Sequence, residues 1–383
     1  MKKIISFSVS LIMVLGIFSM LASAADFKSK KIVSIEAGYS NSFFVTKSGE
    51  LYAAGKGTAG QLGDGNNSNY EKFTKVMDDV KAVSAGGEHT LVQKKDGSLW
   101  VCGSNKVGQF GNSATEGSNV PVKIFDEVTY FMAGYSYSLV VKPDGTLWSF
   151  GSNSKKQFGE DPSPLTEPKQ LTEGVKSAYA NDYYVFYIKT DDSLWNFTTN
   201  TKVADKVSSV TGSRESFAYI SDGSLYAFGL NQSGQLGVGN KEDVTDPVKV
   251  FDKVKKAVYS TSYSLILTED DKLYGCGSTE NGYLGTVTES DTTKPVLLQE
   301  GITDVSSVST HTMATSTAGE IYAWGSNTYN ELADMYTEKT AETEKSSGGG
   351  VSGSTKILLY IGGGVILLLA AFFIVRTVKK KKA

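Results

Sequence analysis

The sequence predicts an all-β fold, a seven-bladed β-propeller of four-stranded blades, followed by one C-terminal transmembrane helix. Three observations favour this fold class. A repeat recurs seven times, a tight-turn signal stands at the same place in each copy, and the 383 residues include 20 Tyr and 18 Phe. Aromatic residues are enriched in strands, and repeats of roughly 40 to 50 residues are typical of propeller blades.

The repeat is marked by a Leu or Ile that is followed by an aromatic residue. Successive pairs lie 48, 48, 47, 31, 48 and 48 residues apart, so only the fourth unit is short. The seven pairs are Leu51-Tyr52, Leu99-Trp100, Leu147-Trp148, Leu194-Trp195, Leu225-Tyr226, Leu273-Tyr274 and Ile321-Tyr322.

Each unit contains the signals of four short strands. A two-residue turn such as Asp96-Gly97 precedes the aromatic pair, and such turns join hairpin strands because Gly and Asp tolerate a positive φ. A loop that reads Gly-Ser-Asn-x-x-Gly-Gln-Leu-Gly in its best copies follows, and a strand then opens near a proline such as Pro121 or Pro247. Proline suits an outer edge strand because it lacks the N–H donor. Such a unit cannot bury both of its faces alone, so the units are expected to stack into a ring.

The two ends of the chain predict a single-pass membrane protein. A basic start, an apolar run and Ala22-Ser23-Ala24 form the pattern of a cleaved secretory signal. Residues 357–375 are 19 uncharged residues, long enough to span a bilayer, and basic residues follow from Arg376 onward. Because basic residues stay cytoplasmic, the body of the protein is expected on the extracellular surface of the cell membrane.

The expected organisation has five parts. They are a signal peptide (1–24), a propeller ectodomain (25–335), a Gly/Ser-rich linker (336–355), the transmembrane helix (356–376) and a basic cytoplasmic tail (377–383). Eight of the 38 Lys and Arg residues lie in the terminal segments, whereas all 41 Asp and Glu residues lie between them. The acidic body gives no electrostatic reason to bind nucleic acid.

The repeat pattern A-G-x-x-H-T-L…D-G-x-L-W-x-x-G-S-N-x-x-G-Q-L-G resembles that of the regulator of chromosome condensation family. The best copies are residues 85–111 and 211–237, and the resemblance covers about residues 32–334. It implies a seven-unit propeller that uses one loop-bearing face as a protein-contact surface, here in a secreted, membrane-anchored member of bacterial type. The founding member is a nuclear exchange factor that binds chromatin, and the predicted location of this chain argues against that activity.

The sequence departs from this pattern at two places. Unit four lacks the Gly-Gln-Leu-Gly loop, and the last loop is degraded to Asn330-Glu-Leu-Ala. No clear outer strand follows Asp334, so the way in which the ring closes is left open.

No residues form a pattern that predicts catalysis, a metal site or a cofactor. His89 and His311 occupy one repeat position, which favours structural hydrogen bonds. Cys102 and Cys276 share another position, where other units carry Phe or Trp, so buried free thiols are expected. The last glycine of the loop is interpreted as a structural repeat feature at Gly63, Gly111, Gly159 and Gly237. The protein is therefore not expected to be an enzyme.

The candidate binding residues occupy the two variable positions of the A-G-x-x-H-T loop, which should lie on the same face as the Gly-Ser-Asn loop. They are Tyr39, Glu88, Tyr135, Asp182, Tyr183 and Arg214. Exposed Tyr is a common contact residue, although these tyrosines could instead cap the core. The predicted function is a surface-displayed, non-enzymatic module that binds an extracellular or cell-surface protein. The alternatives are a carbohydrate or cell-wall binding module and an inhibitor of an extracellular enzyme.

Overall fold

The computed structural model describes Phe27 and residues 30–285, 290–308 and 310–333, together with 360–361 and 364–365. The chain divides into two compact units, residues 1–337 and 338–383. In the second unit, β28 (Tyr360–Ile361) and β29 (Gly364–Val365) form a short antiparallel pair.

Most residues of the predicted terminal segments lie outside the part of the chain that the structure describes. The signal peptide (1–24), the linker (336–355) and the basic tail (377–383) lie outside the described residues, as does the predicted transmembrane helix (356–376) apart from β28 and β29. Among the residues that are described, no helix is both long enough and apolar enough to cross a membrane.

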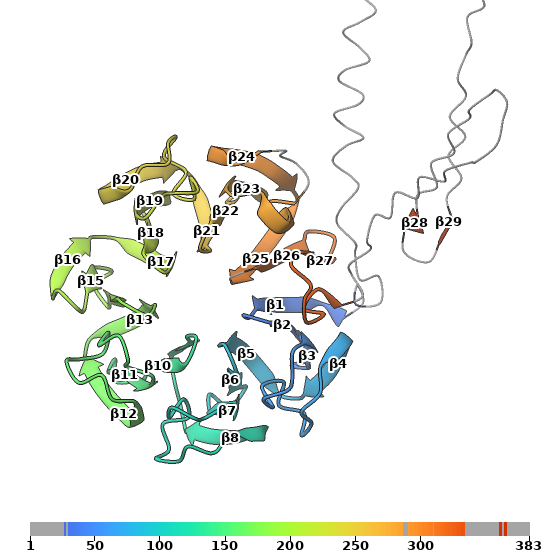
Figure 1. Ribbon diagram of the computed structural model, residues 1–383, viewed down its shortest axis with the longest axis vertical. Helices are drawn as coiled ribbons and strands as arrows, with labels where there is room; N and C mark the ends of the chain where they lie inside the picture. The colour runs from blue at the N-terminus through green and yellow to red at the C-terminus, as the bar shows by residue number, and fades with distance from the viewer. Residues whose placement is uncertain are drawn as a thin grey trace, which may run out of the picture. The chain divides into compact units, whose positions relative to one another are not determined.

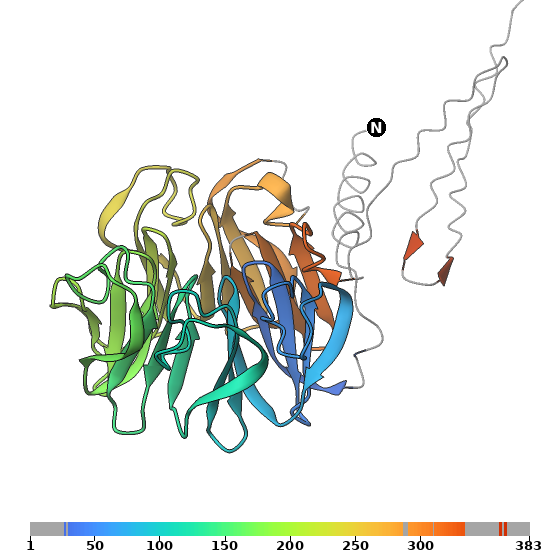
Figure 2. The ribbon, with the colours of Figure 1, turned by 60° about the horizontal axis from the view of Figure 1, so that its bottom comes forward.

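The first unit is a ring of seven antiparallel sheets, or blades, each built from consecutive strands (Figure 1). Six blades have four strands, and blade 7 has three within the described ranges. Figure 2 shows the ring from the side, where the loops gather at its two ends. The predicted seven-bladed, all-β propeller is confirmed.

The strands of blades 1 to 3 are β1 (Ile32–Ala37), β2 (Asn41–Thr46), β3 (Leu51–Gly55), β4 (Tyr70–Met77), β5 (Val80–Ala85), β6 (His89–Lys94), β7 (Leu99–Gly103), β8 (Ser118–Phe125), β9 (Tyr130–Ala133), β10 (Tyr137–Val141), β11 (Leu147–Gly151) and β12 (Leu165–Thr172). Those of blades 4 and 5 are β13 (Val175–Ala180), β14 (Val185–Lys189), β15 (Leu194–Asn196), β16 (Thr201–Ala204), β17 (Val207–Ser213), β18 (Ser216–Ser221), β19 (Ser224–Gly229) and β20 (Val244–Phe251). Those of blades 6 and 7 are β21 (Val254–Tyr259), β22 (Tyr263–Thr268), β23 (Lys272–Gly277), β24 (Thr292–Glu300), β25 (Ile302–Val308), β26 (His311–Ser316) and β27 (Ile321–Gly325), and a 3-10 turn, η2 (Glu280–Gly282), follows β23.

The predicted turns join the second and third strands of the blades. The second residue of every turn has a positive φ, whether it is glycine, as at Gly97 (91°), or aspartate, as at Asp192 (62°) and Asp271 (58°). The residue types that allow this conformation are therefore the ones that the repeat supplies.

The hydrophobic core is divided among the seven seams between neighbouring blades. Side chains alternate along a strand, so Phe43 packs into the seam of blades 1 and 2, whereas Phe44 packs into the seam of blades 7 and 1. Both are fully buried, as is every residue of β2. The middle strands therefore carry apolar residues at adjacent positions, such as Phe43 and Phe44, because the ring covers both faces of each sheet.

Blade 4 fills its seam differently from the others. The Gly-Gln-Leu-Gly loop of the other blades places one apolar residue in the following seam, as Leu62 and Phe110 illustrate. Blade 4 has no such loop, and a tight turn joins β15 to β16. The rings of Phe186, Phe217 and Phe228 fill the seam of blades 4 and 5 in tilted, stacked and edge-to-face pairs, with ring centroids 4.8 to 6.0 Å apart.

The ring closes through the same contacts as an ordinary seam. Blade 1 supplies all four of its own strands, so no outer strand from beyond Asp334 is needed to complete it. The Ala37 N–H donates to Ser306 Oγ across the closing seam at 2.9 Å, as the Ala133 N–H donates to Ser84 Oγ at 3.0 Å between blades 2 and 3. Phe27 adds an aromatic ring to the closing seam, 5.0 Å from the ring of Phe44.

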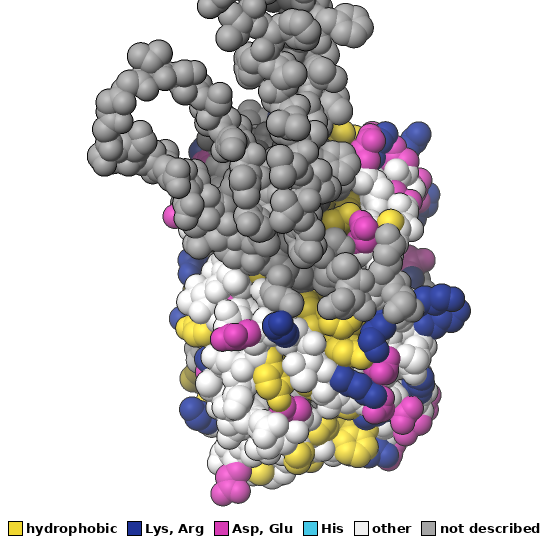
Figure 3. All heavy atoms as spheres, turned by 90° about the vertical axis from the view of Figure 1, so that its right-hand side faces the viewer, with side chains coloured by type: hydrophobic (Ala, Val, Ile, Leu, Met, Phe, Trp, Pro, Cys, Tyr) yellow, Lys and Arg dark blue, Asp and Glu magenta, His cyan; other side chains and the backbone are white. Residues whose placement is uncertain are grey.

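The rim near the closing seam has a mixed surface. Figure 3 shows Lys, Arg and acidic side chains interspersed there, with apolar side chains between them. No single sign of charge dominates the visible part of this side.

Candidate binding face

Two sets of loops lie at the same end of the ring, as predicted. One set joins the first and second strands of each blade, and the other follows the third strand. Backbone hydrogen bonds connect the two sets within a blade, such as Lys56 N–H to Ser40 O (2.8 Å) and Ser104 N–H to Glu88 O (2.7 Å). We call this end the loop face and the opposite end, which carries the tight turns, the hairpin face.

A glycine at the end of the third strand makes this close approach possible. Gly103 has a φ of 106°, and a Cβ atom there would lie 2.2 Å from the Glu88 carbonyl oxygen. The equivalent glycines of five other blades have the same conformation, which is why this position tolerates no side chain. The loop glycines pack differently: a Cβ on Gly63 or Gly237 would lie about 3 Å from the sulfur of Cys102 or Cys276 in the next blade.

The predicted binding residues all lie on the loop face, but their exposure differs. Tyr135 is 55 % exposed and Tyr183 is 41 % exposed, whereas Tyr39 is mostly covered. Asp182 and Arg214 are exposed, and Glu88 is half-buried. Tyr39 therefore has the burial that a capping role requires, and the other two tyrosines are accessible to a partner.

The structure brings Tyr39 of blade 1 and Tyr135 of blade 3 into contact, and the charge of Asp182 in blade 4 acts on Tyr39. The rings of Tyr39 and Tyr135 meet edge to face, with centroids 5.0 Å apart and planes at 80°. Burial raises the pKa of Tyr39 to about 12, and the negative charge of Asp182 adds to that rise. The Gly87 N–H donates to the Tyr135 carbonyl at 2.9 Å, which anchors the loop of blade 3 to that of blade 2.

Lysines lie over two other tyrosines of the loop face. Lys155 Nζ lies 5.8 Å from the ring centroid of Tyr183, and Lys56 Nζ lies 5.7 Å from that of Tyr329. Lys56 also pairs with Glu88 at 3.0 Å. Tyr329 is 41 % exposed and is not among the predicted binding residues, which all come from the A-G-x-x-H-T loop. The two variable positions of the Gly-Ser-Asn-x-x-Gly loop would have identified both Lys155 and Tyr329.

Asn181 and Tyr179 join blades 4 and 5 on the same face, and the Tyr179 hydroxyl donates to the Gly212 carbonyl. Asn181 Oδ1 accepts from the Tyr183 and Tyr184 N–H groups at 2.9 and 2.8 Å, and its Nδ2 donates to the Arg214 carbonyl. Because Asn181 is buried, these bonds fix the loop that presents Asp182 and Tyr183.

The two histidines lie in blade seams. His89 Nε2 is 3.1 Å from Ser138 Oγ, which itself donates to the Gln109 carbonyl, so the imidazole is the donor. His311 Nε2 is likewise 2.9 Å from Ser42 Oγ. Burial lowers the pKa of each histidine to about 4, so both are neutral at pH 7.

The two cysteines are free and buried, as predicted. Burial raises the pKa of both thiols to about 12. Because the thiolate is the reactive form, neither residue is a nucleophile at neutral pH.

Charged residues of the central channel form a second candidate site. Glu36 on β1 accepts from the Ala85 N–H of blade 2 at 3.3 Å and from Ser306 Oγ of blade 7 at 3.5 Å. Lys256 on β21 pairs with Asp304 on β25 at 2.7 Å. Burial raises the pKa of Glu36 to about 7, and the Ala85 N–H and the charge of Lys256 oppose that rise.

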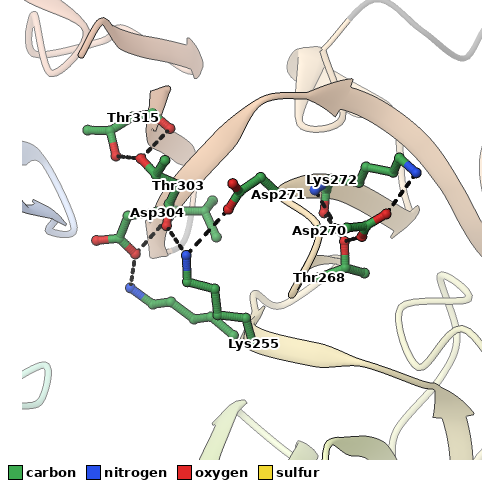
Figure 4. Close-up of polar contacts among 10 residues, drawn as sticks. Lys255, Thr268, Asp270, Asp271, Lys272, Thr303, Asp304 and Thr315 are labelled. Atoms are coloured by element: carbon green, nitrogen blue, oxygen red, sulfur yellow. Dashed lines mark hydrogen bonds and ion pairs between the residues drawn. The ribbon is translucent and has the colours of Figure 1, made fainter. Parts of the chain in front are cut away.

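A cavity of about 310 Å³ opens between blades 6, 7 and 1, at the hairpin-face ends of β1 and β25. Figure 4 shows Lys255 at its edge, where Nζ donates to the Thr303 carbonyl (2.9 Å) and pairs with Asp271 (3.5 Å). Thr303 and Thr315 are joined by their hydroxyl groups at 3.0 Å. These polar groups satisfy one another, so the contacts explain how the blades are held together. Within the described parts of the chain, no three His, Cys, Asp or Glu residues are grouped so that they could hold a metal ion.

Solved structures with the same fold share little sequence with this chain. Human WBSCR16 has a TM-score of 0.65 and 18 % identity, and the match covers 78 % of this chain and 87 % of that one. Prp20p from Saccharomyces cerevisiae has a TM-score of 0.62 and 19 % identity over 80 % of this chain and 85 % of that one. Yeast RCC1 (Prp20) bound to Kap60 has a TM-score of 0.62 and 18 % identity over 80 % and 83 %. No curated protein matches the sequence.

The expected partners need correction. The sequence favoured an extracellular or cell-surface protein or a glycan, with membrane contact through the C-terminal helix, and excluded nucleic acid. Prp20p has this fold and binds Gsp1p and histones, and the structure of yeast RCC1 was solved in complex with Kap60. The fold therefore does not limit partners to the expected classes. The net charge of a whole body also does not fix the local charge of one face, so the acidic balance was too coarse an argument.

The family itself is established by the sequence match. A family model described as the RCC1-like domain matches residues 19–366, which is most of the chain. The predicted resemblance to the regulator of chromosome condensation family is confirmed by this match and by the seven-bladed ring. This chain belongs to the RCC1-like domain family.

Proposed function

We propose that this chain is a non-enzymatic module that binds a protein partner through its loop face. The observation that carries the proposal is the exposure of Tyr135 and Tyr183, which occupy the first and the second variable position of the A-G-x-x-H-T loop in two neighbouring blades. Large aromatic side chains presented on a rigid frame are typical of interface hot spots. The binding of Prp20p to Gsp1p and histones supports a binding role for this fold.

The loop face has the rigidity that such a role needs. In the six blades other than blade 4, the loop between the first and second strands is hydrogen-bonded to the loop after the third strand. In blade 4, buried Asn181 fixes the loop instead. A preorganised surface loses little conformational entropy on binding, which favours affinity.

The binding test is a pair of cross-linking variants. A photo-reactive benzoylphenylalanine replaces Tyr183 on the loop face in one variant and Glu127 on the hairpin face in the other. We expect specific protein adducts from position 183 and none from position 127. Adducts from position 127 alone would place the contact surface on the hairpin face and overturn the proposal.

Substitution then measures the contribution of the aromatic rings. Tyr135→Ala combined with Tyr183→Ala should weaken partner binding by about 2 kcal/mol or more per ring. The same change should alter the free energy of unfolding by only about 0.5 kcal/mol per site, because both residues are exposed. Normal binding by the double variant would contradict the proposal.

We also propose that the propeller is displayed on the outer side of a membrane. The support is the signal pattern of residues 1–24 and the uncharged run 357–375 with its basic flank. Protease added to intact cells should then remove the propeller. Complete protection in cells, with cleavage after lysis, would contradict this location.

A further inference from the structure

We propose that the junction of Tyr39, Tyr135 and Asp182 is a cation-recognition site, and that it takes a protruding Lys or Arg side chain of a protein partner. This inference rests on the proposed function and names the chemistry of that surface. We call the three residues the tyrosine–aspartate notch.

The first argument is the geometry of the rings. Tyr39 and Tyr135 meet at 80° with centroids 5.0 Å apart, so the two ring planes form the walls of a corner. The negatively charged faces of aromatic rings attract cations, and rings set at an angle are the usual way in which proteins surround an ammonium group. Tyr135 is 55 % exposed, so its wall of the corner is accessible from solvent, whereas Tyr39 is mostly covered and forms the inner wall.

The second argument is the charge at the notch. Asp182 is exposed and forms no ion pair with any other residue that the structure describes. Burial is the main cause of the raised pKa of Tyr39, and the charge of Asp182 adds to it, so that charge reaches the phenol. A carboxylate whose charge reaches one of the two rings complements a positive charge placed between them, and it repels an acidic group.

The third argument is that lysines of the protein itself lie over two other tyrosines of the loop face. Lys155 lies over Tyr183 and Lys56 lies over Tyr329, each within 6 Å of the ring centroid. No lysine or arginine of the described chain lies over Tyr39 or Tyr135 in this way. The notch is thus the place on this face where the same pairing is open to a partner.

The test compares two short peptides with the full chain. Acetyl-Gly-Lys-Gly-amide carries the cation, and its norleucine counterpart has a similar length without the charge. Dissociation constants are measured by NMR titration. We expect the lysine peptide to bind about fivefold more tightly than the norleucine peptide. That preference should fall to about one in Asp182→Asn and in Tyr135→Ala, and it should weaken as salt is added.

Asp246→Asn is the matched control, because Asp246 is an exposed aspartate on the outer strand β20. It should keep the full preference for lysine. Equal binding of the two peptides to the unmodified chain would overturn the inference, as would an unchanged preference in Asp182→Asn.

The peptide titration and the cross-linking test can fail independently of each other. Adducts from position 183 without any lysine preference would reject the notch and keep the binding face. A lysine preference that is lost in Asp182→Asn, with no adducts from position 183, would keep the notch chemistry and reject the partner interface.

Discussion

Glu36→Gln should make the protein lose less stability as pH rises from about 4.5 to about 7. The Glu36 carboxyl sits in the wall of the central channel, where it joins blades 7, 1 and 2 through Ser306 and the Ala85 N–H. Burial raises its pKa from 4.5 to about 7. The native state therefore holds this proton more tightly than the unfolded state does.

The sign and size of the effect follow from proton linkage. Below pH 4.5 the group is protonated in both states, and its contribution to stability is fully present. Between pH 4.5 and about 7 the unfolded state loses the proton first, so stability falls as pH rises. At about 1.4 kcal/mol per pH unit, the loss amounts to about 3 kcal/mol at pH 8. A glutamine has no proton to lose, and its amide can still accept from Ala85.

The assay is urea unfolding of both proteins at several pH values from 4 to 8. The quantity of interest is the difference in free energy of unfolding, because effects shared by the two proteins cancel. We expect this difference to increase toward pH 8 in favour of Glu36→Gln, by about 3 kcal/mol relative to pH 4. Glu71→Gln, on the exposed outer strand β4, is the control and should give a flat difference. A flat difference for Glu36→Gln, or one that falls with pH, would refute the reasoning.

Three further outcomes are expected. His89 and His311 have native pKa values of about 4 against 6.5 in the unfolded chain, so they reduce stability as pH falls from 6.5 to 4, by up to about 3 kcal/mol each. His89→Gln, which keeps a donor, should make this decline in stability with falling pH shallower in thermal melts. An unchanged slope of stability against pH would contradict the argument. Gly103→Ala should destabilise the fold by more than about 2 kcal/mol in urea, because the new Cβ would lie 2.2 Å from a carbonyl oxygen at a φ of 106°, and a variant of normal stability would show that the loop can move away. Cys102 and Cys276 should react with a thiol reagent only after denaturation, and rapid labelling of the native chain at pH 8 would show that either thiol is accessible.

Because of the repeat, most of the fold could be predicted from the sequence. Seven aromatic pairs at nearly constant spacing specify seven equivalent units, and turns such as Asp96-Gly97 set the hairpin of each. These are local signals, since φ preferences and strand alternation depend on near neighbours along the chain. The positive φ values of the turns and the buried free thiols followed from such signals. The irregular spacing also showed that unit four is short. It did not show that phenylalanine rings fill the seam beside this unit.

Ring closure and the charged channel depended on contacts between distant parts of the chain. Glu36 looks like any strand glutamate in the sequence, and only the ring brings it beside Ser306, 270 residues away. The same holds for Tyr39, Tyr135 and Asp182, which the repeat aligned as equivalent positions without indicating that two of their rings touch.

The sequence by itself determined the number of blades, their strands and the face on which the variable residues lie, because each of these follows from local periodicity. Only the tertiary structure decided which variable residues are covered, which are exposed and which meet across the ring. Those properties depend on the curvature of the closed ring, which sets how side chains from non-neighbouring blades converge and how far water is excluded around them.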